Sequence, residues 1–504
     1  MASAALPRTA PVPPATTAAG LASNAGALAP GRILSQAAAI IALLLLNKAG
    51  LPGNIGFFGI LLMLLPLGRD WPMKVLTLLF LGLICNQWYV PKSPFWTVAR
   101  FCLPPIVLLV ELADMSRLRV GLTRQGFYRA HLLFVVVSVV LTTLTGYFVH
   151  ISLLKLVNYT IVTTAIFAGI EIQRSRRNDM CEWFVTLIVV VVVLGLASLP
   201  LGIAYNAKPL VREGAASVFN GPLYHSNTMG PFSALMTLYL ACVFLFGGHR
   251  NRWLCLLLVP PLVYFMRLTQ SRTSFAALLA GAAVLTGLSF MLTRRGSIAL
   301  RMNLPRWLLI AAIAAAFLGV VVADASTGGR LSTAAASFIN KGGRSDSLDL
   351  DQVLSSRIGR IEYSWENFRQ SPWIGIGFEV STDPWFQQYT TLFYAPVEKG
   401  FLPTAILEQS GLIGAFFFLI TIATLIAWLA RCVNVPGLVM YVTFLVVNCG
   451  EVMYFGVAGH GAFAWLLVAG GIMLGQFTVR DVRWPFTRTP RSNTMPALQG
   501  RAAA

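Results

Sequence analysis

Long apolar runs fill most of this 504-residue chain and constrain its fold more than any other feature. An α-helix needs about 20 apolar residues to cross about 30 Å of hydrocarbon. Suitable runs lie near 33–49, 54–68, 73–90, 95–112, 127–149, 156–172, 183–205, 229–247, 252–268, 274–292, 306–323, 404–430, 437–457 and 459–479. The first two are short, so we expect about twelve to fourteen spans in an all-α polytopic membrane bundle.

The composition agrees with a membrane protein and argues against a nucleic-acid-binding one. Only 11% of the residues are charged, against about 25% in soluble domains. The net charge is +19, but the basic residues form short clusters between apolar runs rather than one basic face. The seven cysteines lie in or beside apolar runs, so we interpret them as small buried hydrophobic residues and not as a disulfide framework.

Basic residues are divided unequally between the two sets of alternate connections. One set is rich in Lys and Arg, around 69–74, 117–129, 174–177, 250–252, 294–306 and 431, and the C-terminal tail belongs with it. The other set is sparse and holds Lys48, Lys92, Lys155, Lys208, Arg212, Arg267 and Arg272. Cytoplasmic connections carry the excess of Lys and Arg. We therefore expect both termini in the cytoplasm and the sparse face outside.

The same reasoning divides the chain into five parts. We expect a disordered cytoplasmic tail at 1–32, a transmembrane bundle at 33–323 and a large external loop at 324–403. C-terminal transmembrane helices at 404–479 and a basic cytoplasmic tail at 480–504 complete the chain. Within the loop, Ile358, Ile361, Trp365 and Phe368 recur at helical spacing. This pattern predicts an amphipathic helix with one apolar face on the membrane or the bundle.

Unusual polar residues gather on the predicted outer face. Those outside the loop are Arg212, His225, Asn227, Arg267, Arg272 and His460, and those in or just after it are Arg357, Arg360, Glu398, Lys399 and Glu408. Arg side chains bind phosphate with two parallel hydrogen bonds. Several basic groups and a few acids at one membrane face thus favour a lipid-linked diphosphate substrate.

Structural explanations exist for several of these residues. The His225-Ser-Asn sequence is typical of a helix N-cap, His460 lies in a Gly-His-Gly turn, and Arg267 is placed to snorkel from a helix end. Arg272 is different, because a cation at a helix start opposes the helix dipole. The chain has no Walker sequence, no Cys/His pattern with metal-ligand spacing and no Gly-x-Ser-x-Gly elbow, so nothing predicts a nucleotide cofactor or a metal.

Four segments, in order, resemble the O-antigen ligase and polymerase superfamily of bacterial membrane enzymes. NGPLYHSNTMG is similar to its His-x-Asn-x-x-Gly segment and QSRTSFAALLAG to its Ser-Arg helix start. SSRIGRIEYSWENFRQSPWIGIGF resembles its Arg…Pro-x-x-Gly-x-Gly loop segment, and LEQSGLIGAFFFL resembles its Glu-x-x-Gly-x-x-Gly segment. Family ligases have a His residue ahead of that last motif. This chain has Gly400 at the corresponding position, with Glu398 and Lys399 beside it.

The resemblance implies a metal-independent glycosyltransferase of the bacterial inner membrane that acts on undecaprenyl-pyrophosphate-linked glycan at the periplasmic face. It implies membrane lipid and other polysaccharide-assembly proteins as partners, and no cofactor. We expect the pyrophosphate to contact Arg212, Arg272, Arg357, Arg360 and Lys399. We expect Glu398 as the catalytic base with His225 as the second candidate, and supporting roles for Asn227, Glu408 and His460.

Three functions remain open at this point. The missing His favours a polymerase of exopolysaccharide or O-antigen repeats. An O-antigen ligase, which transfers the glycan to lipid A-core or another acceptor, would share every motif. A transporter or flippase of lipid-linked sugars belongs to another class, and it would be expected to carry more ionisable groups at mid-membrane.

Overall fold

The computed structural model is helical in nearly all the residues that it describes. Those residues are 29–118, 121–122, 125–145, 148–173, 177–203, 205–206, 218–247, 252–294, 326, 350–380, 399–456 and 459–475. Within them lie fourteen α-helices, two short 3₁₀ helices and one pair of two-residue strands. The predicted all-α polytopic fold is confirmed, with β1 and β2 as a minor addition.

The first half of the chain supplies seven α-helices before a small strand pair. They are α2 (Pro30–Leu46), α3 (Leu51–Leu64), α4 (Trp71–Ile84), α5 (Pro94–Leu118), α6 (Gly126–Thr145), α7 (Val149–Ile172) and α8 (Arg177–Ser198). The 3₁₀ helices η1 (Asn47–Ala49) and η2 (Leu65–Leu67) follow α2 and α3. Strands β1 (Tyr205–Asn206) and β2 (Val218–Phe219) then pair antiparallel.

The second half supplies the other seven α-helices. They are α9 (Ser226–Phe246), α10 (Leu254–Leu268), α11 (Arg272–Arg294), α14 (Leu350–Gln370), α16 (Leu402–Arg431), α17 (Val435–Asn448) and α18 (His460–Gly475). The ten predicted spans from 33–49 to 274–292 each coincide with one helix, from α2 to α11. The last three, from 404–430 onwards, coincide with α16, α17 and α18. The predicted span at 306–323 lies outside the described residues.

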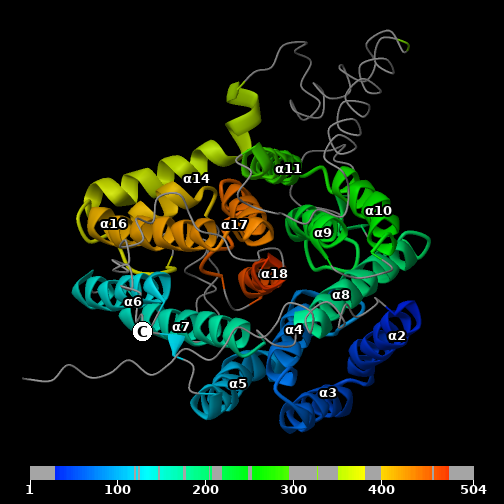
Figure 1. The fold of residues 1–504 in the computed structure, drawn as a ribbon. Coiled ribbons are helices and arrows are strands. Elements are labelled where there is room, and N and C mark those ends of the chain that lie inside the picture. Colours follow the sequence, from blue (N-terminus) through cyan, green and yellow to red (C-terminus); the bar gives the residue numbers. More distant parts are fainter. Residues whose placement is uncertain are drawn as a thin grey trace, which may run out of the picture.

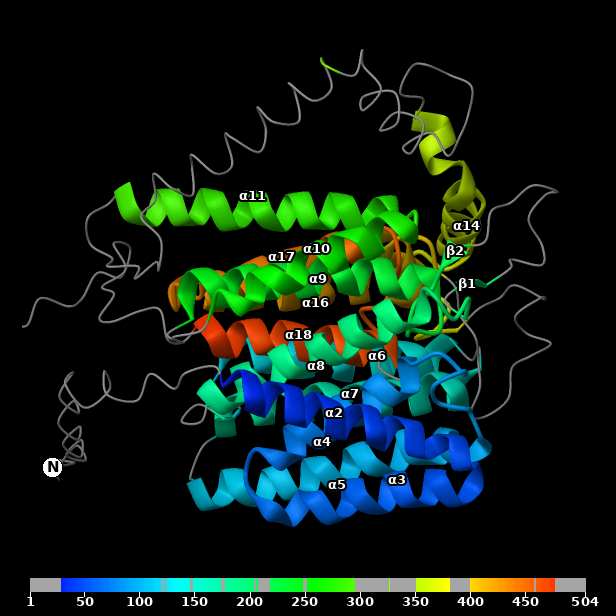
Figure 2. The same cartoon turned by 90° about the vertical axis from the view of Figure 1, so that its right-hand side faces the viewer.

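Helix α18 is the centre of the bundle. Figure 1 shows it surrounded by α4, α7, α8, α9 and α17, and its side chains from Gly461 to Gly475 are buried. A helix that is apolar all round belongs in such a protein-lined position. Helices α3 and α5 lie at one edge of the bundle and α11 and α14 at the other (Figure 2).

Eight of the described helices are long and apolar enough to cross a membrane, and five apolar helices are shorter. Two of the shorter ones end sooner than their apolar runs predict. Helix α4 ends at Ile84 because the next residues pair with the segment before α9: Asn86 N donates to Pro222 O at 2.7 Å. Helix α17 ends at Asn448 because its side-chain oxygen accepts from the backbone N–H groups of Met453 and Tyr454, each at 2.7 Å.

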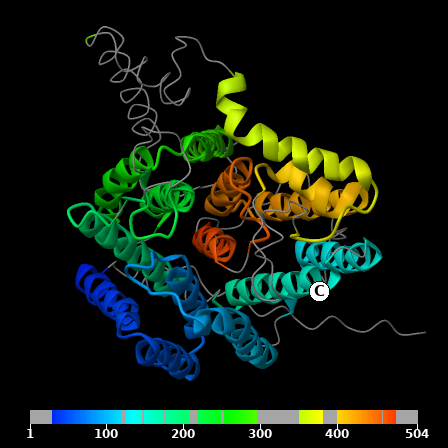
Figure 3. The same ribbon diagram turned by 180° about the vertical axis from the view of Figure 1, so that it is seen from behind.

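The amphipathic helix predicted within 324–403 is present as α14, which lies along α16 (Figure 3). Its burial bears on the two predicted placements of its apolar face, the membrane or the bundle. Ser364 and Asn367 are its most buried side chains, at 3% and 5% exposed, while Trp365 is 39% exposed. The face that turns inward makes a polar contact, from Asn367 to Glu408 on α16. Trp365 therefore does not pack into the bundle, which leaves the membrane as the predicted place for its side chain.

All seven cysteines are free thiols. Cys85, Cys181, Cys242 and Cys255 are buried, as expected of small hydrophobic residues. Cys102, Cys432 and Cys449 are exposed, which departs from the prediction. Cys102 lies within α5, where an exposed position faces lipid rather than the core and a weakly polar thiol is tolerated. Cys432 and Cys449 instead follow the last residues of α16 and α17.

Candidate functional site

The segment that leads into α9 is held against the end of α4. Tyr224 N donates to Ile84 O at 2.8 Å, and Cys85 and Leu223 form an isolated antiparallel β-bridge. These backbone bonds fix the residues just before His225. The start of α9 is therefore tied to the connection between α4 and α5 at one end of the bundle.

His225 is the N-cap of α9. Its Nδ1 atom accepts a hydrogen bond of 3.1 Å from the backbone N–H of Asn227. A neutral imidazole that accepts at Nδ1 carries its hydrogen at Nε2 and donates there. The predicted cap is thus present, although the His225 ring and not the Ser226 or Asn227 side chain makes the capping bond. The cap directs the Nε2–H group of a neutral His225 away from the α9 backbone.

His460, the first residue of α18, joins the same group. Its Nδ1 atom lies 3.1 Å from Oγ1 of Thr228 in the first turn of α9. His225 and Lys92 both lie close enough to His460 to interact with it electrostatically. Two histidines predicted from separate parts of the sequence therefore meet at one end of the bundle.

Gly230 brings Arg272 to this end of α9. An added Cβ at Gly230 would lie 2.6 Å from Ser274 Oγ, 2.7 Å from Ser271 Cβ and 2.8 Å from Thr269 Oγ1. Such a close approach leaves no room for a side chain, so the turn before α11 packs directly on the first turns of α9. Arg272, the first residue of α11, is half-buried beside this contact.

Lys399 and Glu408 form a buried ion pair. Lys399 Nζ lies 2.6 Å from Glu408 Oε1, and the side chains are 5% and 0% exposed. Asn367 Nδ2 of α14 donates to the same oxygen at 2.8 Å. Burial this deep makes Glu408 part of the packing between α14 and α16. It also commits the Lys399 ammonium to a protein carboxylate.

The segment after α14 runs along an opened turn of α16. Ile376 N donates to Glu408 O at 2.8 Å, and Leu412 N donates to Pro372 O at 2.8 Å. Gly411 has a φ of 60° and interrupts the helical backbone of α16. An added Cβ at Gly411 would overlap the backbone of Trp373, and one at Gly375 would overlap that of Gln409 and Ser410. The first glycine of each of the last two motifs is thus explained by close backbone packing.

Lys92 is a cation at this site that the sequence did not single out. It lies between α4 and α5, where its Nζ atom donates to Gly82 O at 2.5 Å and sits 4.9 Å from the centre of the Trp96 ring. Enclosure by the protein lowers the pKa of the Lys92 ammonium to about 8. In the sequence, the one sign of Lys92 is that it belongs to the sparse set of Lys and Arg residues on the predicted outer face.

The remaining predicted residues are less closely placed. Arg360 is exposed on α14, and Arg357 lies in the same helix although its side chain is outside the described part. Arg212 and Glu398 also lie outside the described residues. Within the described ranges no three His, Cys, Asp or Glu side chains are grouped so that they could hold a metal ion.

The fold and this arrangement define a multi-pass membrane protein with a polar, cation-bearing site at one end of its bundle. Residues 262–419 match a family model described as O-antigen ligase. The predicted resemblance is confirmed over that range, which includes Arg272, α14 and the ion pair of Lys399 and Glu408. Among curated proteins, none matches the chain significantly.

The match supports a glycan-processing membrane protein related to O-antigen ligases and polymerases, with a lipid-linked glycan as its class of substrate. It does not distinguish a polymerase from a ligase. The segment with His225 lies before the matched range, and the structure joins it to that range through the contact of Gly230 with residues 269–274.

Proposed function

We propose that this protein polymerises undecaprenyl-pyrophosphate-linked oligosaccharide repeat units at the periplasmic face of the bacterial inner membrane. The observation that carries the proposal is the packing of Gly230 against residues 269–274. This contact sets Arg272 beside the histidine-bearing start of α9. A cation next to a helix N-terminus suits an anionic group, because the free backbone N–H groups there favour negative charge.

The reaction is a nucleophilic displacement at an anomeric carbon. A sugar hydroxyl of one lipid-linked unit attacks C1 of the glycan on another, and a base takes the hydroxyl proton. The bond between C1 and the diphosphate oxygen breaks, and undecaprenyl pyrophosphate leaves with the bonding electrons. The difficult step is the growth of negative charge on that oxygen, so well-placed donors accelerate it most.

We assign the donors first. Arg272 binds the diphosphate, with Arg212, Arg357 and Arg360 as further ligands from the loops. His225 donates from Nε2 because its Nδ1 atom caps α9. Asn227 and His460 support this group, through the cap and through the contact of His460 with Thr228.

The acid–base assignments follow from burial and pairing. Glu398 remains the base, because the His225 cap leaves no ring nitrogen ready to accept a proton. Lys399 is committed to Glu408, so we give both a positioning role: they hold the residues after Glu398 against α14 and α16. A ligand role for Lys399 at the diphosphate would require it to leave a buried carboxylate unpaired, which costs several kcal/mol, about 3–5 in measured cases.

An O-antigen ligase is the second candidate, and the description of the matching family favours it. The departure at Gly400 favours the polymerase, since the sequence has no His where family ligases have one. The two reactions share the donor and differ only in the acceptor that supplies the hydroxyl.

The purified protein distinguishes these functions when it is reconstituted with a lipid-linked repeat unit as the sole glycan. A ladder of longer lipid-linked products is the result expected of a polymerase. Products that form only after lipid A-core is added would identify a ligase. Transfer of the unchanged unit across the bilayer, without any longer product, would identify a transporter and reject the enzymatic proposal.

A further inference from the structure

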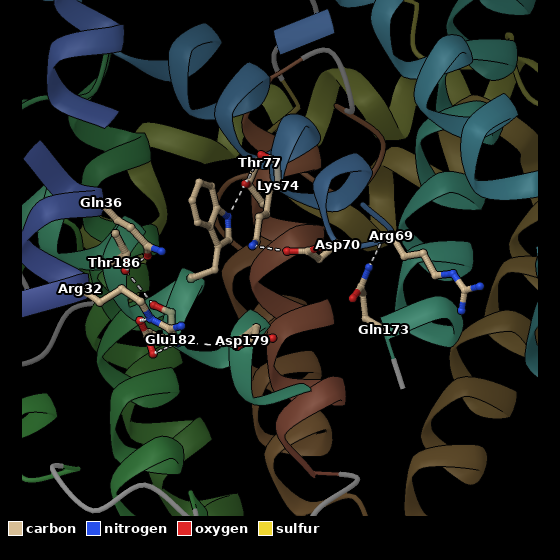
Figure 4. Close-up of polar contacts among 11 residues, drawn as sticks. Arg32, Gln36, Arg69, Asp70, Lys74, Thr77, Gln173, Asp179, Glu182 and Thr186 are labelled. Carbon is tan, nitrogen blue, oxygen red and sulfur yellow. Dashed lines mark hydrogen bonds and ion pairs between the residues drawn. The ribbon is translucent and has the colours of Figure 1, made fainter. Parts of the chain in front are cut away.

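A second polar cluster lies at the other end of the bundle, where α2, α4 and α8 begin (Figure 4). It surrounds a pocket of about 200 Å³, which we call the α2–α4–α8 pocket. Its lining includes Arg32, Gln36, Asp70, Lys74, Asp179 and Glu182. Helix α4 starts at this pocket and ends at Ile84 beside the candidate functional site, so the two sites occupy opposite ends of the same helix.

Lys74 is the buried cation of the pocket. Its side chain is 11% exposed and pairs with Asp70. Its Nζ atom lies 5.0 Å from the ring centre of Trp71 and 5.4 Å from that of Trp183. An ammonium has three N–H donors, and within the described residues Asp70 is its one hydrogen-bond acceptor. Buried donors without acceptors are costly, so the pocket is suited to a ligand that brings oxygen acceptors.

Acidic groups line the other side of the same pocket. Glu182 accepts two hydrogen bonds from Arg32, and its side chain is 4% exposed. Asp179 is 54% exposed, and its contact with Arg32 Nη2 is long, at 3.6 Å. The Asp179 carboxylate is therefore open to solvent and only loosely paired, which lets it receive a second cation.

The surroundings of the pocket match the level of lipid headgroups. Trp71 and Trp183 flank it, and Trp is enriched at membrane–water interfaces. Trp183 Nε1 is held by Thr77 Oγ1 at 2.8 Å, so its ring position is fixed. On the face of α2 opposite Arg32 and Gln36, Leu34 is 62% exposed and offers an apolar surface to acyl chains.

We propose that the α2–α4–α8 pocket binds the headgroup of a zwitterionic aminophospholipid such as phosphatidylethanolamine. The lipid phosphate accepts hydrogen bonds from Lys74, and the primary ammonium donates to Asp179. Phosphatidylglycerol, an anionic phospholipid with a glycerol headgroup, supplies no cation for Asp179. A quaternary ammonium, as in phosphatidylcholine, has no N–H to donate.

The test is lipid retention by the full-length protein, measured by native mass spectrometry after purification with defined lipid. We expect phosphatidylethanolamine to be retained at least about tenfold more strongly than phosphatidylglycerol or phosphatidylcholine, as for one charge-assisted hydrogen bond. Lys74→Met should remove retention. Asp179→Asn, which changes a half-exposed side chain and leaves the core intact, should remove the preference for phosphatidylethanolamine.

Arg117→Gln is the matched control, because Arg117 is a 74% exposed cation at the end of α5 and outside the pocket. It should retain the lipid as the wild type does. Equal retention of the three lipids, or unchanged preference in Asp179→Asn, would overturn the proposal. Stabilisation by soluble phosphoethanolamine, with none by the lipid, would overturn the assignment to a membrane source.

Discussion

Nζ of Lys399 lies 2.6 Å from Oε1 of Glu408, with both side chains almost wholly excluded from solvent. The pair joins the start of α16 to the loop before it, and Asn367 extends the contact to α14. Two buried charges are tolerated only when each compensates the other. This ion pair therefore fixes the residues that lead into α16.

Breaking this pair should destabilise the protein strongly. Glu408→Gln leaves the Lys399 ammonium buried without its counter-charge, so we expect a loss of about 3–5 kcal/mol in the free energy of unfolding. Replacing both residues, as Lys399→Met with Glu408→Leu, should restore much of that loss because no buried charge remains. Unfolding in detergent measures the double-mutant cycle.

The contact of Arg117, which is 74% exposed, with Asp114 is long, at 3.4 Å, and provides the control. Arg117→Gln should change the free energy of unfolding by only about 0–1 kcal/mol. Equal, small effects of Glu408→Gln and Arg117→Gln would contradict the assignment of the buried pair as a structural contact.

The glycines of the loop segment make a second prediction. Gly375→Ala and Gly411→Ala introduce methyl groups into space that backbone atoms occupy, at φ angles of 73° and 60° that disfavour alanine. Both should lower the melting temperature and expose the 371–380 segment to protease. Gly59→Ala in α3 meets nothing within 4 Å and should be neutral or slightly stabilising. A harmless Gly411→Ala would reject the docking of 372–378 on α16.

Most of the fold could be predicted from the sequence because a membrane imposes one rule on every span. Each long apolar run has to form a helix that satisfies its own backbone. The ends of α4 and α17 could not be predicted in this way. Asn86 and Asn448 decide them through contacts with residues far along the chain or in the next loop, and apolar periodicity carries no information about such contacts.

The candidate site could be predicted in part. Polar residues that are rare in apolar surroundings, such as His225, Arg272 and His460, were visible in the sequence, and the structure brings their segments together. The pairing of Lys399 with Glu408 was not visible, because a buried ion pair and two separate ligands look the same in a sequence. Lys92 was missed because a lone Lys in a short connection is normally read as an orientation signal.

The orientation of the bundle predicts how two thiols react. In a Cys-free background, Glu366→Cys on exposed α14 should react with a membrane-impermeant thiol reagent added to intact spheroplasts. A variant that keeps only the exposed Cys432, at the opposite end of α16, should react only after lysis. The reverse labelling pattern would overturn the orientation and place the proposed site in the cytoplasm.

Lys92 predicts a pH dependence of stability. Burial lowers its pKa to about 8, while the unfolded chain has an ordinary Lys pKa of about 10.4. Between these values the unfolded state binds more protons, so the Lys92 contribution to stability rises with pH. The unfolding free energy of the wild type, minus that of Lys92→Met, should therefore become more positive from pH 8 to pH 10. A flat difference would show that the ammonium is not enclosed.

The rate of glycan transfer by Arg272 variants tests the central claim most directly. With a lipid-linked repeat unit as the sole glycan, the wild-type protein should release one undecaprenyl pyrophosphate for each unit added to a growing product. Arg272→Ala should lower this rate by about 100-fold or more, as expected when a charged donor to the leaving group is lost. Arg272→Lys should recover only part of it, and Arg431→Ala, at the other end of the bundle, should act as the wild type. Full activity in Arg272→Ala, or longer products without release of the carrier, would contradict the account.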